Sequence, residues 1–293
     1  MTTRSSLRVE ILTATAALAA AGVGSPQVDA ELLAAHLLGV PRTRLGLVPL
    51  VDDGWVTRYR ELVAGRERRV PLQHLTGVAV LGPVEVEVGP GVFVPRPETE
   101  SLVEWAVAAV RGVTTPVVVD LCTGSGAIAL AVAAARPDAR VHAVERSPHA
   151  LSWARRNVER HRAAGGSLVD LRGGDIADPR LLVDLEGQVD LVTANPPYVP
   201  EGTAVEPEVG VHDPAEAVFA GPDGLDVIRP LLSVAAALLR PGGVLAVEHD
   251  DTQGESVPAL LRSRRVLADV EDHRDLSGRP RFTTARRVRL RDR

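Results

Sequence analysis

Residues 117–135 read VVVDLCTGSGAIALAVAAA and combine three local patterns. The apolar run VVVDLC is typical of a parallel strand buried on both faces, and GAIALAVAAA is typical of a helix of small residues. Between them, Gly124 and Gly126 allow a ligand to approach the backbone closely, and the start of the helix offers free N–H groups. This stretch predicts an α/β sheet with a ligand site at the carboxyl end of its first strand.

Strands and helices alternate from Glu98 onward. A helix is expected over 147–161, with Ser147 as its cap, and another over 225–239. Residues 266–288 are expected to form a terminal antiparallel pair around a Ser-Gly turn. Further strands are predicted in VHAVE (141–145), LVDLRGGD (168–175), DLVTAN (190–195) and PGGVLAVEHD (241–250). The order indicates a doubly wound α/β sheet.

The sequence ahead of the sheet has a different character. Residues 1–72 are predicted to form a small helical domain, residues 73–95 a β-hairpin connector built on VEVEV, and residues 96–293 the main domain. The apolar segment near the N-terminus is expected to be a first helix rather than a signal peptide, because Glu10 precedes it directly. Asp29 is a candidate N-cap of a second helix.

The third predicted helix, over about 55–69, carries a cluster of arginines. Arg66, Arg68 and Arg69 are expected to form a solvated face.

Three acidic residues stand at the ends of successive predicted strands. These are Asp120, Glu145 and Asp175. Carboxyl ends of parallel strands meet at one edge of the sheet, where open α/β sheets bind ligands. Glu145 is placed to accept hydrogen bonds from both ribose hydroxyls of a nucleoside. Asp175 is placed to accept a hydrogen bond from an adenine amino group. The glycines, with Ala129, also satisfy a dinucleotide-binding pattern, so they do not select the nucleoside by themselves.

The fourth predicted strand ends in TANPPYVP (193–200). Two prolines cannot donate to a sheet, so the strand must stop there. The side-chain oxygen of Asn195 and the carbonyl of Pro196 can each accept one N–H of an incoming NH2 group. Tyr198 offers a ring face to a flat amide or base. The motif predicts a pocket for an amino or amide nitrogen beside a nucleoside site.

Composition excludes several classes of function. The chain has 293 residues and a net charge of 33 − 38 = −5, which gives no global attraction to nucleic acid. Cys122 is the single cysteine, so no intrachain disulfide can form, as is usual in a reducing cytoplasm. The eight histidines are scattered, so we predict no metal site, and no stretch is apolar enough to suggest a membrane span.

Together these motifs resemble the HemK/PrmC family of release factor glutamine methyltransferases, over nearly the whole chain. The resemblance is carried by DAELLAAHLLG (29–39), RRVPLQHLTG (68–77), FVPRPETE (93–100), DLCTGSGAIAL (120–130), NPPYVP (195–200), PEVGVHDPAEAVFAGPDGLDVI (207–228) and AVEHD (246–250). It implies a Rossmann-like, S-adenosylmethionine-dependent methyltransferase in the cytoplasm. The expected reaction moves a methyl group to the side-chain amide nitrogen (N5) of the Gly-Gly-Gln glutamine of class I peptide release factors.

The resemblance also implies roles for individual residues. Glu145 would hold the ribose of the cofactor, and Asp175 and Ile176 would lie beside its adenine. The helical domain would dock the release factor. The cofactor's methionine part would be wrapped by Cys122, Thr123, Gly124, Ser125 and Gly126, with Asp120 and Asn195 also at the cofactor site. The glutamine would be held by Asn195, Pro196, Pro197 and Tyr198, and the site would be closed over by Phe93, Arg96, Glu98, Thr99 and Glu100.

Two positions depart from the family pattern, and three other functions compete. Cys122 stands where many members have Gly, which fits if its backbone is not left-handed, and Asp250 stands where Gly is common. The first alternative is a DNA or RNA methyltransferase acting on adenine N6 or cytosine N4, which calls for a basic surface or a target-recognition region, whereas the chain has a net charge of −5 and a small helical domain. A nicotinamide dehydrogenase leaves the NPPY motif unexplained, and a non-catalytic module would have no need of it.

Overall fold

The computed structural model describes residues 4–178 and 180–289. The chain divides into two units. The helical unit comprises Met1–Val78 and also Val205–His212, and the sheet unit comprises Ala79–Ala204 and Asp213–Arg293. Each unit has its own hydrophobic core. A short segment of the second half of the chain therefore belongs to the helical unit.

The helical unit is built around three long helices. Its core packs Leu18, Leu33 and Tyr59 at its centre, and the Tyr59 ring stacks on Trp55 with ring centroids 4.7 Å apart. The unit contains β1 (Arg4–Ser6), α1 (Leu7–Ala20), α2 (Pro26–Leu38), the 3-10 helix η1 (Arg42–Leu47), β2 (Leu50–Asp52), α3 (Asp53–Glu67) and α4 (Leu72–Thr76). The expected first helix is thus present as α1, and β1 pairs with β2 in an antiparallel ribbon that the sequence did not suggest.

The expectation for Asp29 as a helix cap is wrong. α2 begins at Pro26 and its N-cap residue is Ser25, so Asp29 lies one turn inside the helix. Proline is favoured at the first helical position because the N–H that it lacks would be unpaired there. Asp29 is instead buried and accepts a hydrogen bond from Arg66 Nε at 2.7 Å.

The expectation of a solvated arginine face is also wrong for Arg66, whose side chain is only 8% exposed. Arg66 Nη1 lies 2.6 Å from Glu208 Oε1, and Arg69 donates to both oxygens of the same carboxylate at 2.7 Å. Glu208 begins the short π-helix η4 (Glu208–His212). The arginines therefore bind the returning segment 205–212 to the helical unit.

The sheet unit contains a seven-stranded sheet in the order β10-β11-β9-β8-β5-β6-β7. The five strands from β9 to β7 are parallel, and β11 and β10 close one edge as an antiparallel pair. The strands are β5 (Val117–Leu121), β6 (Arg140–Glu145), β7 (Val169–Gly173), β8 (Val189–Ala194), β9 (Leu239–Glu248), β10 (Leu267–Arg274) and β11 (Pro280–Arg287). The predicted α/β fold is confirmed.

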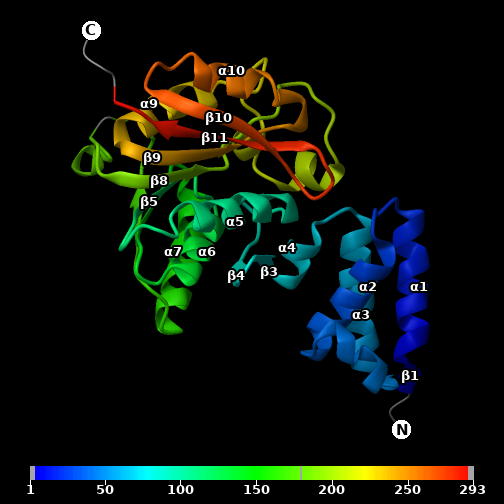
Figure 1. Ribbon diagram of the computed structural model, residues 1–293. Helices are drawn as coiled ribbons and strands as arrows, with labels where there is room; N and C mark the ends of the chain where they lie inside the picture. The colour runs from blue at the N-terminus through cyan, green and yellow to red at the C-terminus, as the bar shows by residue number, and fades with distance from the viewer. Residues whose placement is uncertain (1–3, 179, 290–293) are drawn as a thin grey trace. The chain divides into compact units, whose positions relative to one another are not determined.

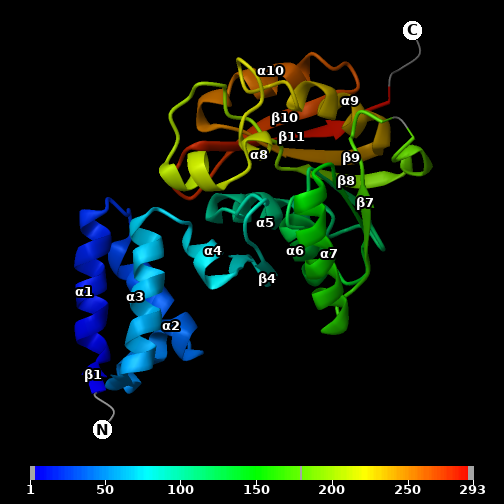
Figure 2. The same ribbon diagram turned by 180° about the vertical axis from the view of Figure 1, so that it is seen from behind.

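Helices cover both faces of this sheet (Figures 1 and 2). On one face lie α5 (Glu100–Ala109), α6 (Ala127–Ala135) and α7 (Pro148–Ala163), and on the other lie α9 (Ile228–Leu238) and α10 (Ser256–Arg262). Four of the six alanines of α6 are buried, and their small side chains let this helix approach the sheet closely. A β-hairpin of β3 (Val78–Leu81) and β4 (Val84–Glu87) packs its apolar residues into the α5–α7 core.

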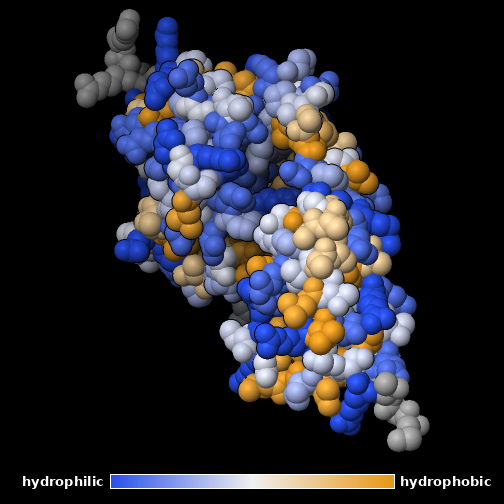
Figure 3. Space-filling view, turned by 90° about the vertical axis from the view of Figure 1, so that its right-hand side faces the viewer, coloured by the Kyte–Doolittle hydropathy of each residue, from blue (hydrophilic) through white to orange (hydrophobic). Residues whose placement is uncertain are grey.

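Exposed apolar residues occur on both units. Figure 3 shows hydrophobic side chains interspersed with charged ones over the helical unit, in the lower part of the view. The large exposed apolar residues of this unit are Val9, Leu12, Leu47, Leu50 and Val211. Within residues 4–178 and 180–289, no helix combines the length and apolarity needed to cross a membrane.

Candidate active site

The strand order reverses direction between β5 and β8. β5 is followed on one side by β6 and β7, whereas β8 lies on its other side. In the parallel register Leu121 pairs with Ala194, so the loops that begin at Cys122 and Asn195 leave the sheet side by side. Such a reversal opens a crevice at the carboxyl ends of the strands, which is the usual ligand site of this architecture. The glycine loop and the NPPY motif therefore meet there, as expected.

Asp120 joins these two strand ends. It is fully buried, and its Oδ1 accepts from Thr193 Oγ1 at 2.8 Å while its Oδ2 accepts from Thr123 Oγ1 at 2.5 Å. Burial raises its pKa to about 6, and the two threonine hydroxyls oppose this shift. Because both carboxylate oxygens already accept hydroxyl groups, Asp120 fixes the position of the loop that follows it.

The loop 122–126 adopts left-handed backbone angles at three positions. Cys122 has φ = 59°, Gly124 has φ = 58° and Gly126 has φ = 86°. A cysteine was expected to fit at position 122 only if the backbone there is not left-handed, and this condition is not met. A residue with a side chain in this conformation costs about 1–2 kcal/mol of strain. Burial and the nearby carboxylates of Glu145 and Asp120 raise the pKa of the Cys122 thiol, so it stays neutral.

Glu145 connects the loops after β5 and β6. Its Oε2 accepts from the backbone N–H of Gly124 at 2.8 Å, and its Oε1 accepts from that of Ser147 at 2.7 Å. Ser147 is the N-cap residue of α7, although its hydroxyl accepts no capping hydrogen bond from the helix. A carboxylate at the start of α6 repels a pyrophosphate, which a dinucleotide would place there. The geometry thus favours a nucleoside without phosphates over the dinucleotide interpretation.

Asp175 and Ile176 follow β7 at the same edge. The N–H of Gly174 donates to the Glu145 carbonyl at 2.9 Å, which brings the turn beside Glu145. Asp175 is partly exposed, and its Oδ1 accepts from the N–H of Ala177 at 2.9 Å. Ile176 packs partly buried against the α9 side of the sheet. The turn therefore offers one carboxylate and one apolar side chain next to Glu145.

In the NPPY motif, Asn195 is anchored through its amide nitrogen. Nδ2 donates to Thr99 Oγ1 at 3.3 Å, and this assignment leaves Oδ1 free as an acceptor. Thr99 is 2% exposed and lies at the junction of the 3-10 helix η2 (Pro97–Thr99) with α5. Pro196 is buried and Pro197 is partly buried. Thr99 is one of the residues expected near the site, and its contact with Asn195 gives it a defined role.

Tyr198 is held at both its hydroxyl and its backbone. Its Oη donates to Glu248 Oε1 at 3.2 Å, and its carbonyl accepts from Gln253 Nε2 at 3.0 Å. Gly224, with φ = 73°, passes so close that a Cβ there would lie 2.1 Å from the Tyr198 carbonyl oxygen. Only glycine fits at this position. The NPPY backbone is therefore fixed from the side of the 221–224 turn.

Glu248 is a further residue of the candidate site, and no sequence motif described above includes it as a site residue. It ends β9, is 1% exposed, and has a pKa raised to about 7, chiefly by burial. The signal for it was an acid inside the otherwise apolar strand VLAVE, because buried carboxyl groups are costly and usually have a function.

The segment 93–100 contributes a second anchored loop. The Arg96 guanidinium lies 5.0 Å from the centre of the Phe93 ring and forms an ion pair with Asp213. Asp213 also accepts from the N–H of Val94 at 3.3 Å. Glu98 and Glu100 are exposed, so they are not part of the buried network around Asn195.

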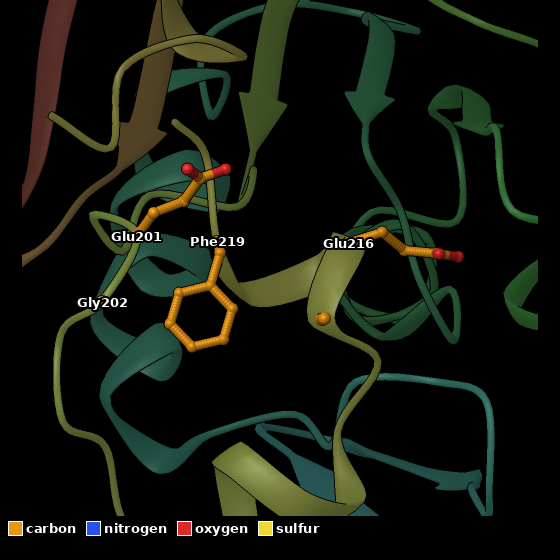
Figure 4. Close-up of a pocket in the computed structure, with 5 residues that line it drawn as sticks. Glu201, Gly202, Glu216 and Phe219 are labelled. Carbon is orange, nitrogen blue, oxygen red and sulfur yellow. The ribbon is translucent and has the colours of Figure 1, made fainter. Parts of the chain in front are cut away.

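A pocket of about 400 Å³ follows the NPPY motif along the chain. It is lined by Glu201, Gly202, Ala215, Glu216 and Phe219, the last three in or next to α8 (Ala215–Val218). Figure 4 shows the Glu201 and Glu216 carboxylates pointing in different directions rather than toward one point. This pocket is separate from the buried contacts of Asn195. Within the described ranges, no group of three or more His, Cys, Asp or Glu side chains could hold a metal ion.

Comparison with known proteins agrees with this geometry. The family model for the PrmC N-terminal domain matches residues 11–77, and that for the methyltransferase small domain matches residues 97–212. A release factor glutamine methyltransferase of Streptomyces coelicolor is 56% identical over 96% of this chain and 98% of its own length. The chain belongs to the family of release factor glutamine methyltransferases. A further member, from Mycolicibacterium smegmatis, is 54% identical over 96% of this chain and 98% of its own length.

A solved structure outside the family shares the fold. The hMettl16 catalytic domain, solved in complex with a 3'UTR hairpin, covers 83% of this chain and 85% of its own, with 14% identity and a TM-score of 0.52. At this identity the likeness concerns the fold alone. Membership in the glutamine methyltransferase family favours the protein-methylating function over the nucleic-acid alternative.

Proposed function

We propose that this protein transfers a methyl group from S-adenosylmethionine to the side-chain amide nitrogen (N5) of the glutamine in the Gly-Gly-Gln motif of class I peptide release factors. The observation that carries the proposal is the anchored amide of Asn195. Its nitrogen is occupied by Thr99, so its oxygen is directed to accept from an incoming NH2 group. Family membership supports the choice of glutamine as the group that carries this NH2.

The residues at the crevice fit S-adenosylmethionine. Each Glu145 oxygen accepts one backbone N–H and retains a lone pair for a ribose hydroxyl. Asp175 and Ile176 offer the adenine an acceptor and an apolar contact. The loop from Cys122 to Gly126 would hold the methionine part of the cofactor. Asp120 fixes this loop through its hydrogen bond from the Thr123 hydroxyl. When bound, the cofactor supplies an activated methyl group on a sulfonium.

The chain's own contribution is to bind and orient the glutamine amide. An amide nitrogen is a weak nucleophile because its lone pair is delocalised into the carbonyl. Asn195 Oδ1 and the Pro196 carbonyl would each accept one N–H, which fixes the direction of the nitrogen and favours a more pyramidal geometry. The Tyr198 ring would pack against the amide plane. Such positioning can supply much of the rate, and no strong base is required before transfer.

The remaining assignments follow from this substrate. We propose that the helical unit docks the release factor, through exposed apolar residues such as Leu12 and Leu47. Leu47→Glu should then raise KM for intact release factor and leave activity on a short Gly-Gly-Gln peptide unchanged. A release factor acts with ribosomes, so we place the enzyme in the cytoplasm, without a membrane partner and without direct nucleic-acid binding.

The experiment is to incubate the protein with S-adenosylmethionine and a class I release factor and to locate the methyl group by peptide mass spectrometry. A methyl on the Gly-Gly-Gln glutamine supports the proposal. Transfer to DNA or RNA, with none to the release factor, would replace it with the nucleic-acid alternative.

A further inference from the structure

Glu248 carries a buried carboxyl group that is influenced by two residues of the candidate site. One is Tyr198 of the NPPY motif, and the other is Thr99, which anchors Asn195. Its Oε1 accepts from Tyr198 Oη at 3.2 Å. The Thr99 hydroxyl is the neighbour that most strongly favours the charged form of this carboxyl. Its second oxygen, Oε2, is buried and receives no full hydrogen bond within the part of the chain that the structure describes. One oxygen thus accepts from Tyr198, and the other keeps unused acceptor capacity.

The direction of each hydrogen bond in this chain can be worked out. A threonine hydroxyl has one proton and two lone pairs. A Thr99 hydroxyl that directs its proton to the carboxyl of Glu248 has only lone pairs left for Asn195, in agreement with the Asn195 Nδ2 to Thr99 Oγ1 contact of 3.3 Å. An acceptor at this position selects Nδ2 of the Asn195 amide and excludes Oδ1. With the Thr99 proton in that direction, the carboxyl of Glu248 determines which end of the Asn195 amide faces the crevice.

Tyr198 is fixed by the same carboxyl. Burial and the charge of Glu248 raise the pKa of Tyr198, so its hydroxyl remains protonated and acts as a donor. Glu248 thus accepts a hydrogen bond from the Tyr198 hydroxyl, and its nearest polar influence on the other side is the Thr99 hydroxyl, which itself accepts from Asn195. The first and last residues of NPPY are tied to one group that lies in a different strand, β9.

We propose that Glu248 and Thr99 are positioning residues that hold the Asn195 amide with Oδ1 toward the substrate amide, Glu248 acting through Thr99 and also setting the Tyr198 ring. This deepens the proposed function and rests on it for its effect on turnover. Without the pair, the Asn195 amide can rotate by 180° and present two N–H groups to a substrate that also presents N–H groups. The wrong orientation repels the substrate amide instead of accepting from it.

Packing alone does not account for Glu248. Burying a carboxyl group costs free energy, and replacing buried charged groups by apolar residues of similar size is often neutral or stabilising. A residue retained only to fill space at the end of β9 would not need to be an acid. The positioning role explains both the carboxyl and the hydroxyl at position 99.

The first test uses a matched pair at position 99. Thr99→Val removes the hydroxyl and keeps the shape, and Thr99→Ser keeps the hydroxyl and loses a methyl group. We expect Thr99→Val to lower kcat at least 10-fold with unchanged cofactor affinity by calorimetry, and Thr99→Ser to stay within about 3-fold of the wild type. A Thr99→Val enzyme with wild-type kcat would overturn the inference.

The second test asks whether Glu248 acts through Asn195. Glu248→Gln should lower kcat at least 10-fold in the wild-type background and have no further effect in an Asn195→Ala background, because the residues work as one unit. A purely structural role would lower the rate by the same factor in both backgrounds, which would contradict the proposal.

A third readout requires no substrate. Asn157 and Asn195 are the two asparagines of the chain, so protein labelled with 15N-asparagine gives two side-chain amide pairs by NMR. Asn157 donates to the carbonyls of Glu87 and Ser125 and serves as an internal control. We expect Thr99→Val and Glu248→Gln to shift the Asn195 pair and leave the Asn157 pair unchanged. An unmoved Asn195 pair would overturn the positioning role, whereas a wild type that does not methylate release factor would overturn the proposed function alone.

Discussion

Asp120 of β5 and Thr193 of β8 are joined by a side-chain hydrogen bond of 2.8 Å between two fully buried groups. This bond links the strand that leads into the glycine loop to the strand that leads into NPPY. The two halves of the candidate active site are thereby fixed relative to each other.

The first prediction concerns this bond. Thr193→Val keeps the volume but leaves an oxygen of Asp120 without its donor, and we expect unfolding free energy to fall by about 1–3 kcal/mol. Urea unfolding gives the measurement. Thr13→Val on α1 is the control, since its hydroxyl bond to the Val9 carbonyl is exposed, and it should change stability by less than about 0.5 kcal/mol. Equal losses in the two variants would contradict the role of the buried bond.

The second prediction concerns cofactor affinity. Glu145→Gln replaces one carboxylate oxygen by an NH2 group, which is a donor. The remaining oxygen cannot accept from the N–H groups of both Gly124 and Ser147, and the side chain offers fewer acceptors to the ribose hydroxyls. We expect calorimetry to show S-adenosylmethionine binding weakened by about 10-fold or more. Glu159→Gln, on the exposed part of α7, should bind like the wild type. Full affinity in Glu145→Gln would remove Glu145 from the cofactor site.

The third prediction tests the backbone strain at Cys122. Cys122→Gly and Cys122→Ala both remove the thiol, but only glycine adopts φ = 59° without a steric penalty. We expect the glycine variant to be more stable than the alanine variant by about 1 kcal/mol, measured by urea unfolding. An alanine variant as stable as the glycine variant would show that the loop relaxes around the side chain.

The fourth prediction compares two glutamates of the returning segment. Glu208 is paired with the buried Arg66, whereas the side chain of Glu206 is 76% exposed. Glu208→Ala leaves a buried guanidinium without one partner and should destabilise the helical unit by about 3 kcal/mol. Glu206→Ala should cost less than about 1 kcal/mol, because exposed ion pairs contribute little. Hydrogen exchange of the α2 and α3 amides measures the stability of the helical unit separately from that of the sheet unit.

The same glutamate gives a pH dependence. Partial burial acts to raise the pKa of Glu208, but the hydrogen bonds from Arg69 and Arg66 lower it to about 2, from an ordinary value of 4.5. A lowered folded-state pKa means that this stabilisation is present above pH 4.5 and is lost as the pH falls toward 2. The stability difference between wild type and Glu208→Ala should therefore shrink over that range. A constant difference would contradict the pairing.

The fifth prediction has the opposite sign. Burial raises the pKa of Glu248 to about 7 from 4.5, with Thr99, Arg281 and Tyr198 opposing the shift and Glu98 adding to it. The folded protein then binds this proton more tightly, so the contribution is present below pH 4.5 and is lost as the pH rises through 7. Unfolding free energy of the wild type relative to Glu248→Gln should fall by about 3 kcal/mol between pH 4.5 and 8. A difference that is flat with pH would show that Glu248 titrates normally.

Much of the fold and of the crevice could be predicted because the signals are local. VVVDLC has the continuous apolar run of a buried parallel strand, whereas GAIALAVAAA has the small residues of a closely packed helix. The glycines between them mark the turn. NPPY is conspicuous because two prolines must end a strand. Parallel topology then brings the ends of separate strands to one edge, so Asp120, Glu145 and Asn195 could be grouped without knowing any contact.

The rest depends on partners that lie far apart in the chain. Arg66 was expected to be solvated because its partner Glu208 follows 142 residues later, beyond any helical period. The same holds for Glu248, which reaches Tyr198 across 50 residues. The left-handed backbone at Cys122 is set by the loop geometry around Asp120 and Glu145, and a cysteine gives no sign of it. Local patterns predict elements, whereas packing decides which charged groups become buried.

The most direct measurement compares wild type and Asn195→Ala for methyl transfer and cofactor binding in parallel. Both proteins are titrated with S-adenosylmethionine by calorimetry, then incubated with it and a class I release factor, and the product is mapped by peptide mass spectrometry. We expect a methyl group on the Gly-Gly-Gln glutamine with the wild type, and we expect Asn195→Ala to lose most of the turnover while it retains cofactor binding. Full-rate methylation by Asn195→Ala would contradict the account of the amide pocket.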